Sequence, residues 1–223
     1  MYQKLSGPVS FSSECRCMGG IFWLPIVIMA LTLILTLFSF HEPLDIALVR
    51  GQWGPLALPW IGLWIIHLFQ PVVDTPGKEA LLALPYLSVS FGVGRVLWTA
   101  LFYSMLFYIG WCSLALSFHI FDQWAWYDSV LPIASIYFLA SSSFMLMAIT
   151  RNMMHSYILF GGFCIFQYMT RGGALGPLYP FHWAFPHPMR TNDNNLFLLV
   201  GAGIICMTVG HIFFANREYI TKK

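Results

Sequence analysis

Long apolar stretches without charge alternate with short polar connections along most of the chain. A helix needs about 20 apolar residues to cross the hydrocarbon core of a bilayer. Six stretches have this character, although the fifth is short: residues 21–40, 53–73, 96–118, 129–150, 153–170 and 196–215. None of them contains a lysine, an arginine or an acidic residue. The pattern therefore predicts an all-α integral membrane protein with six transmembrane helices, forming a single domain over residues 1–223.

The composition supports this class and excludes others. Hydrophobic residues make up 58% of the chain and charged residues only 9%, whereas a soluble domain has roughly 25% charged residues. The net charge of +2 comes without any cluster of basic residues, so we expect no binding of nucleic acid. The five cysteines are scattered without a CxxC pair, which argues against a disulfide framework or a zinc site.

The lysines and arginines predict the orientation in the membrane. With a cytoplasmic N-terminus, the inner segments hold eight of them: Lys4, Arg16, Lys78, Arg95, Arg151, Arg217, Lys222 and Lys223. The outer loops hold three, Arg50, Arg171 and Arg190. Because basic residues concentrate on the cytoplasmic side of membrane proteins, we expect both termini in the cytoplasm.

The connection between the second and third apolar stretches is a half-polar segment, GKEALLALPYLSVSFGVGR at residues 77–95. Thr75 can cap a helix, and Pro76 fits its first position, where a missing N–H costs nothing. Pro85 disfavours helical geometry at Leu84 and so ends the helix there. About ten residues rise roughly 15 Å as a helix, which is too short to span. We expect an amphipathic helix at the cytoplasmic face, serving either as a simple connector or as a contact for a cytosolic partner.

The last outer segment, residues 171–195, is long and rich in glycine, proline and aromatic residues. Aromatic side chains such as Tyr179, Trp183 and Phe185 are typical of a membrane interface. With its prolines, the segment predicts a re-entrant element in the outer leaflet, centred on Tyr179, Pro180, Phe181, His182 and Trp183. Backbone of this kind is tolerated at membrane depth only where protein or a water-filled cavity covers it.

Four stretches together resemble the type-2 ABC transporter permease family. An acidic residue followed by LLALP resembles the segment between the second and third spans of that family. SSSFMLMAITRNMMHSYIL (residues 141–159) is similar to its fourth span and the turn that follows. YPFHWAFP (179–186) is similar to its last outer segment, and FFANREYITKK (213–223) to its basic exit from the sixth span. The resemblance covers nearly the whole chain.

The resemblance implies a permease subunit in the cell (plasma) membrane that pairs with a second permease protomer, as a homo- or heterodimer, and with a cytoplasmic ABC ATPase dimer. The short helix would be the coupling helix that contacts the ATPase: Lys78, Glu79, Leu81, Leu82, Leu84 and Pro85. The chain has no G-x-x-x-x-G-K-[ST] phosphate loop, so ATP and magnesium are expected on the partner ATPase. We expect neither a cofactor nor a catalytic residue on this chain.

Polar residues within the apolar stretches are candidates for lining a translocation path: His67, Gln70 and Gln167. They are equally compatible with hydrogen bonds between helices. The family mostly exports, and the cargo we expect is hydrophobic or amphipathic: a peptide antibiotic or toxin, a lipid or a drug. No acidic residue lies inside a stretch, which argues against proton or sodium coupling.

A second hypothesis is a membrane assembly subunit that does not transport, such as a haem-binding or cofactor-maturation protein. Among the seven histidines, only His67 and His211 fall in comparable inner halves of their spans, as a haem held by two histidines requires. A haem absorption band lost on replacing either histidine would favour this hypothesis. We predict no metal site.

Overall fold

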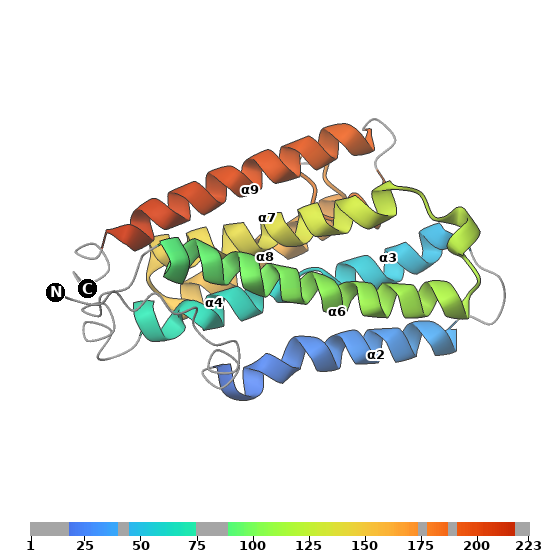
Figure 1. Cartoon of the computed structure of the whole chain (residues 1–223), viewed down its shortest axis with the longest axis horizontal. Helices are drawn as coiled ribbons and strands as arrows, with labels where there is room; N and C mark the ends of the chain where they lie inside the picture. Colours follow the sequence, from blue (N-terminus) through green and yellow to red (C-terminus); the bar gives the residue numbers. More distant parts are fainter. Residues whose placement is uncertain (1–17, 40–44, 75–88, 174–177, 187–190, 217–223) are drawn as a thin grey trace.

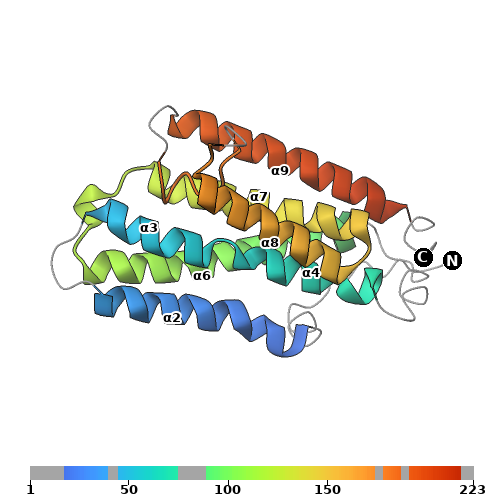
Figure 2. The same ribbon diagram turned by 180° about the vertical axis from the view of Figure 1, so that it is seen from behind.

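The computed structural model describes residues 18–39, 45–74, 89–173, 178–186 and 191–216. These residues form a bundle of long helices, and none of them is in a β-strand (Figures 1 and 2). The elements are the 3₁₀ turn η1 (Gly19–Phe22), α2 (Trp23–Ser39), α3 (Ile46–Ala57), α4 (Trp60–Val73), the π-helical turn η2 (Ser90–Gly94), α6 (Arg95–Ser117), the 3₁₀ turn η3 (Phe121–Gln123), α7 (Tyr127–Thr150), α8 (Met153–Thr170) and α9 (Asn192–Ala215).

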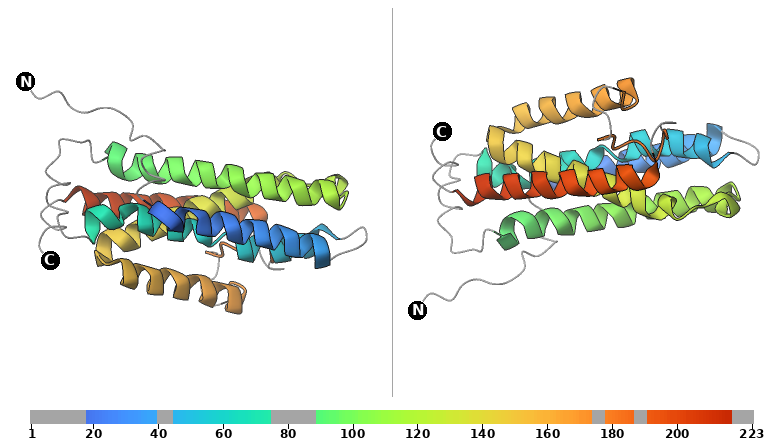
Figure 3. Two further views of the ribbon diagram at one scale, coloured as in Figure 1. Left: turned by 90° about the horizontal axis from the view of Figure 1, so that it is seen from below. Right: turned by 90° about the horizontal axis from the view of Figure 1, so that it is seen from above.

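α4 continues α3 in the same direction, and apart from this pair consecutive helices run in opposite directions along the bundle (Figures 1 and 2). One end, here called the α7–α8 end, holds the turn at Arg151 and Asn152, the last turn of α4 and the end of α9 (Figure 1). The other end, the α6–α7 end, holds η3 and the start of α3, and α8 runs toward it but ends short of them (Figures 2 and 3). The end of α4 and the start of α8 are therefore in contact at the α7–α8 end, and α8 diverges from the other helices toward the opposite end (Figure 3).

Five helical stretches are long and apolar enough to cross a membrane: Gly19–Ser39, Ile46–Val73, Ser90–Ser117, Tyr127–Thr150 and Asn192–Ala215. Large side chains on their outer faces remain exposed in the bundle, such as Phe38 at 76%. This is the architecture of a multi-pass membrane protein, and it confirms the predicted all-helical class. The fifth predicted span coincides with α8 at residues 153–170; it rises about 27 Å and is not among the five.

Two helix boundaries correct the sequence analysis. The second spanning helix begins at Ile46 rather than at residue 53, so Arg50 lies inside it instead of in a loop. α7 begins at Tyr127, which places Asp128 in its first turn, and both charged side chains are buried. The prediction that no charge lies within a span is therefore wrong. Arg50 and Asp128 neutralise each other, which makes burial of both tolerable.

A break separates α3 from α4. Pro55 lies inside α3 and Pro59 stands immediately before α4, and neither can donate a backbone hydrogen bond to the helix. Tyr103 of α6 donates a hydrogen bond from its hydroxyl to the Ala57 carbonyl oxygen at this break. The polar backbone exposed by the break is thus partly satisfied by a neighbouring helix.

α7 is the central helix and packs most extensively against α9 and then α4. Gly203 and Gly210 of α9 face the aromatic side chains of Tyr137 and Phe144 on α7. Glycines let two helix backbones approach closely, which is how helices associate in a membrane without a hydrophobic driving force.

Replacing Gly210 by alanine should therefore destabilise the α7–α9 contact. The new Cβ would lie 2.8 Å from Phe144 Cδ1 and 3.1 Å from the Met145 Cα atom, and overpacking of this kind costs about 1–3 kcal/mol. Gly201 of the same helix has no heavy atom within 4 Å of its Cβ position and is the matched control. We expect thermal unfolding in detergent at a lower temperature for Gly210→Ala, and at an equal or higher one for Gly201→Ala. Equal shifts for both variants would contradict the contact.

Candidate functional site

A groove of about 1120 Å³ opens between α3, α4 and α8. Figure 2 looks onto the side of the bundle where these helices lie together. α3 and α4 contribute Gly51, Gln52, Pro55, Leu56, Trp60 and Leu63, while α8 contributes Tyr157, Phe160, Gly161, Cys164, Ile165 and Tyr168. Residues 181–186 close the groove toward the α6–α7 end with Phe181, Ala184, Phe185 and Pro186.

The two walls meet where Phe160 lies on Gly62. A Cβ atom at Gly62 would be 2.1 Å from the Phe160 ring, so the ring occupies the place of a side chain and holds α8 against α4. The next residue of α8, Gly161, has no heavy atom within 4 Å of its Cβ position. Gly161 therefore leaves open space where the groove begins.

The interior of the groove is apolar and its mouth is charged. Asp45, immediately before α3, accepts a hydrogen bond at 3.0 Å from the backbone N–H of Ala47 and so caps that helix. Arg171, immediately after α8, places its guanidinium 5.4 Å from the centre of the Phe185 ring. Because α3 begins and α8 ends at the α6–α7 end, the acidic and the basic side chain stand at the same end of the groove.

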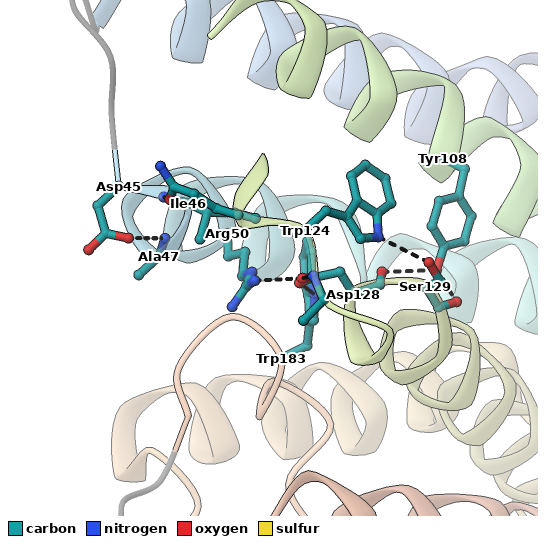
Figure 4. Close-up of polar contacts among 11 residues, drawn as sticks. Asp45, Ile46, Ala47, Arg50, Tyr108, Trp124, Asp128, Ser129 and Trp183 are labelled. Carbon is teal, nitrogen blue, oxygen red and sulfur yellow. Dashed lines mark hydrogen bonds and ion pairs between the residues drawn. The ribbon is translucent and has the colours of Figure 1, made fainter. Parts of the chain in front are cut away.

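A buried polar cluster lies beside the groove and is centred on Asp128 (Figure 4). The Arg50 guanidinium donates to Asp128 Oδ2 at 2.6 Å, and the side chains are 5% and 0% exposed. The backbone N–H of Ala125 also donates to Oδ2, at 2.8 Å. The indole N–H of Trp183 donates to Oδ1 at 2.8 Å. We call these four residues the Asp128 cluster.

The Asp128 cluster joins α3, the start of α7 and the segment at residues 178–186. Trp183 also packs edge-to-face on Trp111, with ring centres 4.9 Å apart, and on Phe107 at 5.7 Å. Gly54 lies against Trp183 and Ala184 so closely that a Cβ atom would be 2.7 Å from that of Ala184. The residues that follow, Phe185 and Pro186, form the groove wall, so the cluster positions that wall.

Two aromatic side chains of this segment are buried within the protein: Tyr179 and Trp183 are 0% and 1% exposed. Burial raises the pKa of the Tyr179 phenol to about 12, despite the opposing effect of Arg171. Asn195 donates to the Tyr179 carbonyl oxygen at 3.2 Å, and a His182 ring nitrogen lies 3.1 Å from the Asn192 amide oxygen. The segment is thereby tied to the first turn of α9.

The other predicted site residues are distributed differently. Phe181 lines the groove, whereas Pro180 is buried without lining it. His67 and Gln70 are half-buried on α4 outside the groove, and Gln167 is buried and donates to the Leu178 carbonyl oxygen at 3.0 Å. These three therefore do not form the groove. The coupling residues Lys78, Glu79, Leu81, Leu82, Leu84 and Pro85 lie outside the residues that the structure describes.

No metal site is formed by the described residues, because nowhere among them do three or more His, Cys, Asp or Glu side chains come together. His67 and His211 lie on α4 and α9, and neither lines the groove. The hypothesis of a haem between them stays a prediction.

The sequence analysis missed the groove and the Asp128 cluster. One signal was present: Arg50 and Asp128 are single charges directly beside long apolar stretches, where an unpaired charge would be costly. No such signal exists for the groove, since most of its lining residues are ordinary apolar side chains and its charged residues are far apart in the sequence. Comparison with known proteins adds no assignment, because no family model, no curated protein and no solved structure matches the chain.

Proposed function

We propose that the chain is the membrane-spanning permease subunit of an ATP-driven ABC exporter and that it carries a hydrophobic or amphipathic molecule in the groove. The observation that carries the proposal is the groove itself: about 1120 Å³ of space with an apolar interior and charged residues at one end. Sites for small organic ligands are typically about 300–1,000 Å³ and mainly apolar, with a few polar groups that orient the ligand.

The groove suits a molecule that comes from the membrane. It lies between helices with exposed apolar faces, for example at Leu48 and Ile165, which are 54% and 62% exposed. A ligand with an apolar body can enter such a groove sideways from the bilayer without crossing water. A strongly hydrophilic solute would have to give up its hydration against Leu56, Leu63 and Ile165.

The connection from α4 to α8 supports a mechanical role for the groove walls. Asp74, immediately after α4, accepts a hydrogen bond at 2.7 Å from the backbone N–H of Met153, the first residue of α8. Asn152, immediately before α8, accepts a hydrogen bond at the same helix N-terminus, from the N–H of His155 at 3.0 Å. Acidic groups are favourable at a helix N-terminus, where N–H groups lack partners. A displacement at the end of α4 is thereby passed to α8, the opposite wall of the groove.

In this proposal, residues 78–85 form the coupling helix that meets the ATPase dimer, and they begin four residues after Asp74 in the chain. A second permease protomer completes the pathway, α8 crosses the membrane as the fifth of six spans, and both termini face the cytoplasm. The segment at residues 178–186 is then the re-entrant element of the outer leaflet, covered by protein as such backbone must be. Nucleotide binding on the ATPase biases a two-state movement of the groove walls.

The test is co-purification of the chain with its ATPase, followed by measurement of ATP hydrolysis. Glu79→Arg should lower the hydrolysis that amphipathic compounds stimulate by roughly tenfold, which is typical of a coupling free energy between sites. Glu218→Arg makes the same change at another position expected in the cytoplasm and should leave hydrolysis within about twofold of the wild type. The proposal is wrong if no ATPase co-purifies, or if the two variants behave alike.

A further inference from the structure

We propose that the occupant of the groove is a single zwitterionic phospholipid with a primary ammonium group, of the phosphatidylethanolamine type. One of its two acyl chains lies along α8 and its head group stands at the α6–α7 end. The proposed lipid is the substrate class of the groove. It rests on the proposed function only because it takes the groove as the transport site.

The length of the groove matches one leaflet of a bilayer. Its lining on α8 runs from Tyr157 to Tyr168, about 17 Å at 1.5 Å per residue. Half of the roughly 30 Å hydrocarbon core is about 15 Å. An acyl chain that starts at the membrane surface therefore fills the groove and ends near Tyr157, at the far end of this lining.

The interior of the groove is an apolar surface with open space for an acyl chain. The side chains along it are Leu56, Leu63, Phe160 and Ile165, together with the open position at Gly161. Burying a methylene group contributes about 0.8 kcal/mol relative to water. That gain is largely absent relative to lipid, so the acyl chain fits the groove without selecting among lipids. Selection must come from the head group.

The charges at the mouth match a head group that carries both signs. Asp45 and Arg171 are the charged side chains among the described residues that line the groove, and both stand at its α6–α7 end. A guanidinium binds phosphate through paired hydrogen bonds. A carboxylate accepts hydrogen bonds from an ammonium group, and Asp45 keeps lone pairs beyond its bond to Ala47. Gln52, half-buried about two turns further along α3, adds an amide to the lining.

Two other common lipids fit less well. An anionic phospholipid such as phosphatidylglycerol satisfies Arg171 but leaves Asp45 facing added negative charge. Phosphatidylcholine has both charges, but its quaternary ammonium has no N–H to donate to Asp45. The pair of charges therefore favours the ethanolamine head group over both.

The experiment measures phospholipid retained by the purified full-length chain, without ATPase or nucleotide. The chain is equilibrated in detergent micelles that contain equal amounts of phosphatidylethanolamine, phosphatidylcholine and phosphatidylglycerol, then washed, and the lipid per chain is determined by native mass spectrometry. The wild type should retain about one phosphatidylethanolamine, with about two- to fivefold preference over the other lipids, the size expected of exposed ion pairs.

Two charge-removing variants test the contacts. Asp45→Asn keeps the helix cap, because asparagine caps as well as aspartate, and should abolish the preference over phosphatidylcholine. Arg171→Asn suits the left-handed backbone at this position, where φ is 46°. It should lower retention of all the phospholipids. Unchanged elution in size-exclusion chromatography shows that both variants are folded.

The proposal is overturned if the wild type retains no phospholipid, if it prefers phosphatidylglycerol, or if neither variant alters retention. Since no ATPase takes part, a chain that retains the lipid but couples to no ATPase refutes the proposed function alone. A chain that couples to an ATPase but shows no lipid preference refutes the present proposal alone.

Discussion

Asp128→Ala is expected to lower the free energy of unfolding by about 3–5 kcal/mol, the cost of leaving a buried charge without its partner. In the native protein Arg50 and Asp128 are 5% and 0% exposed in their side chains and 2.6 Å apart. The alanine variant leaves the Arg50 guanidinium buried among apolar side chains and also removes the acceptor for the Trp183 indole N–H. Thermal unfolding in detergent, followed by circular dichroism, measures the effect.

Two further variants make the result specific. Asp122, in η3 at the same end of the bundle, is exposed, so Asp122→Ala should change stability by no more than about 0.5 kcal/mol. The double variant Arg50→Met with Asp128→Leu removes both charges, and it should be more stable than Asp128→Ala alone, because buried pairs replaced by apolar residues are often tolerated. If Asp128→Ala and Asp122→Ala unfold alike, the Asp128 cluster does not hold the bundle together.

The same variant should also affect the groove. Trp183 is bound to Asp128, and the neighbouring Ala184, Phe185 and Pro186 line the groove. Loss of the hydrogen bond releases this wall, so we expect weaker ligand retention in addition to lower stability. A variant that lost stability while keeping full retention would show that the groove wall is positioned by other contacts.

Gly161→Phe is expected to empty the groove, whereas Gly162→Phe is expected to leave it intact. Both glycines lie in the interior of α8, and neither has a heavy atom within 4 Å of its Cβ position. Gly161 lines the groove and Gly162 does not. A phenylalanine at residue 161 therefore occupies the space of the ligand, while one at 162 extends away from it.

The measurement is retained phospholipid per chain, followed by ATP hydrolysis of the reconstituted complex. We expect retention to fall about tenfold for Gly161→Phe, equivalent to about 1.4 kcal/mol, and to stay within about twofold for Gly162→Phe. The two variants gain similar helix propensity over glycine, so their difference reports the groove rather than the stability of α8. Equal losses, or no loss in either, would show that the ligand does not lie beside Gly161.

Much of the helical architecture follows from the sequence because it depends on local patterns. α8 coincides with its predicted range, since Asn152 caps its start and the chain adopts a left-handed conformation at Arg151 and Arg171 on either side. The apolar stretches predicted the other helices to within a few residues at most ends. The start of the second span was missed because a buried arginine reads locally as a loop residue.

The amino-acid sequence alone determined the class of protein, since the number and length of uncharged apolar stretches decide whether helices can cross a bilayer. It did not determine which helix faces meet. Arg50 and Asp128 are 78 residues apart, and only the packing of α3 against the start of α7 makes them a pair. The groove likewise exists only because Phe160 lies on Gly62 while Gly161 beside it leaves space. Such contacts depend on how well the surfaces of helices far apart in the sequence fit together. A local sequence pattern does not contain this information.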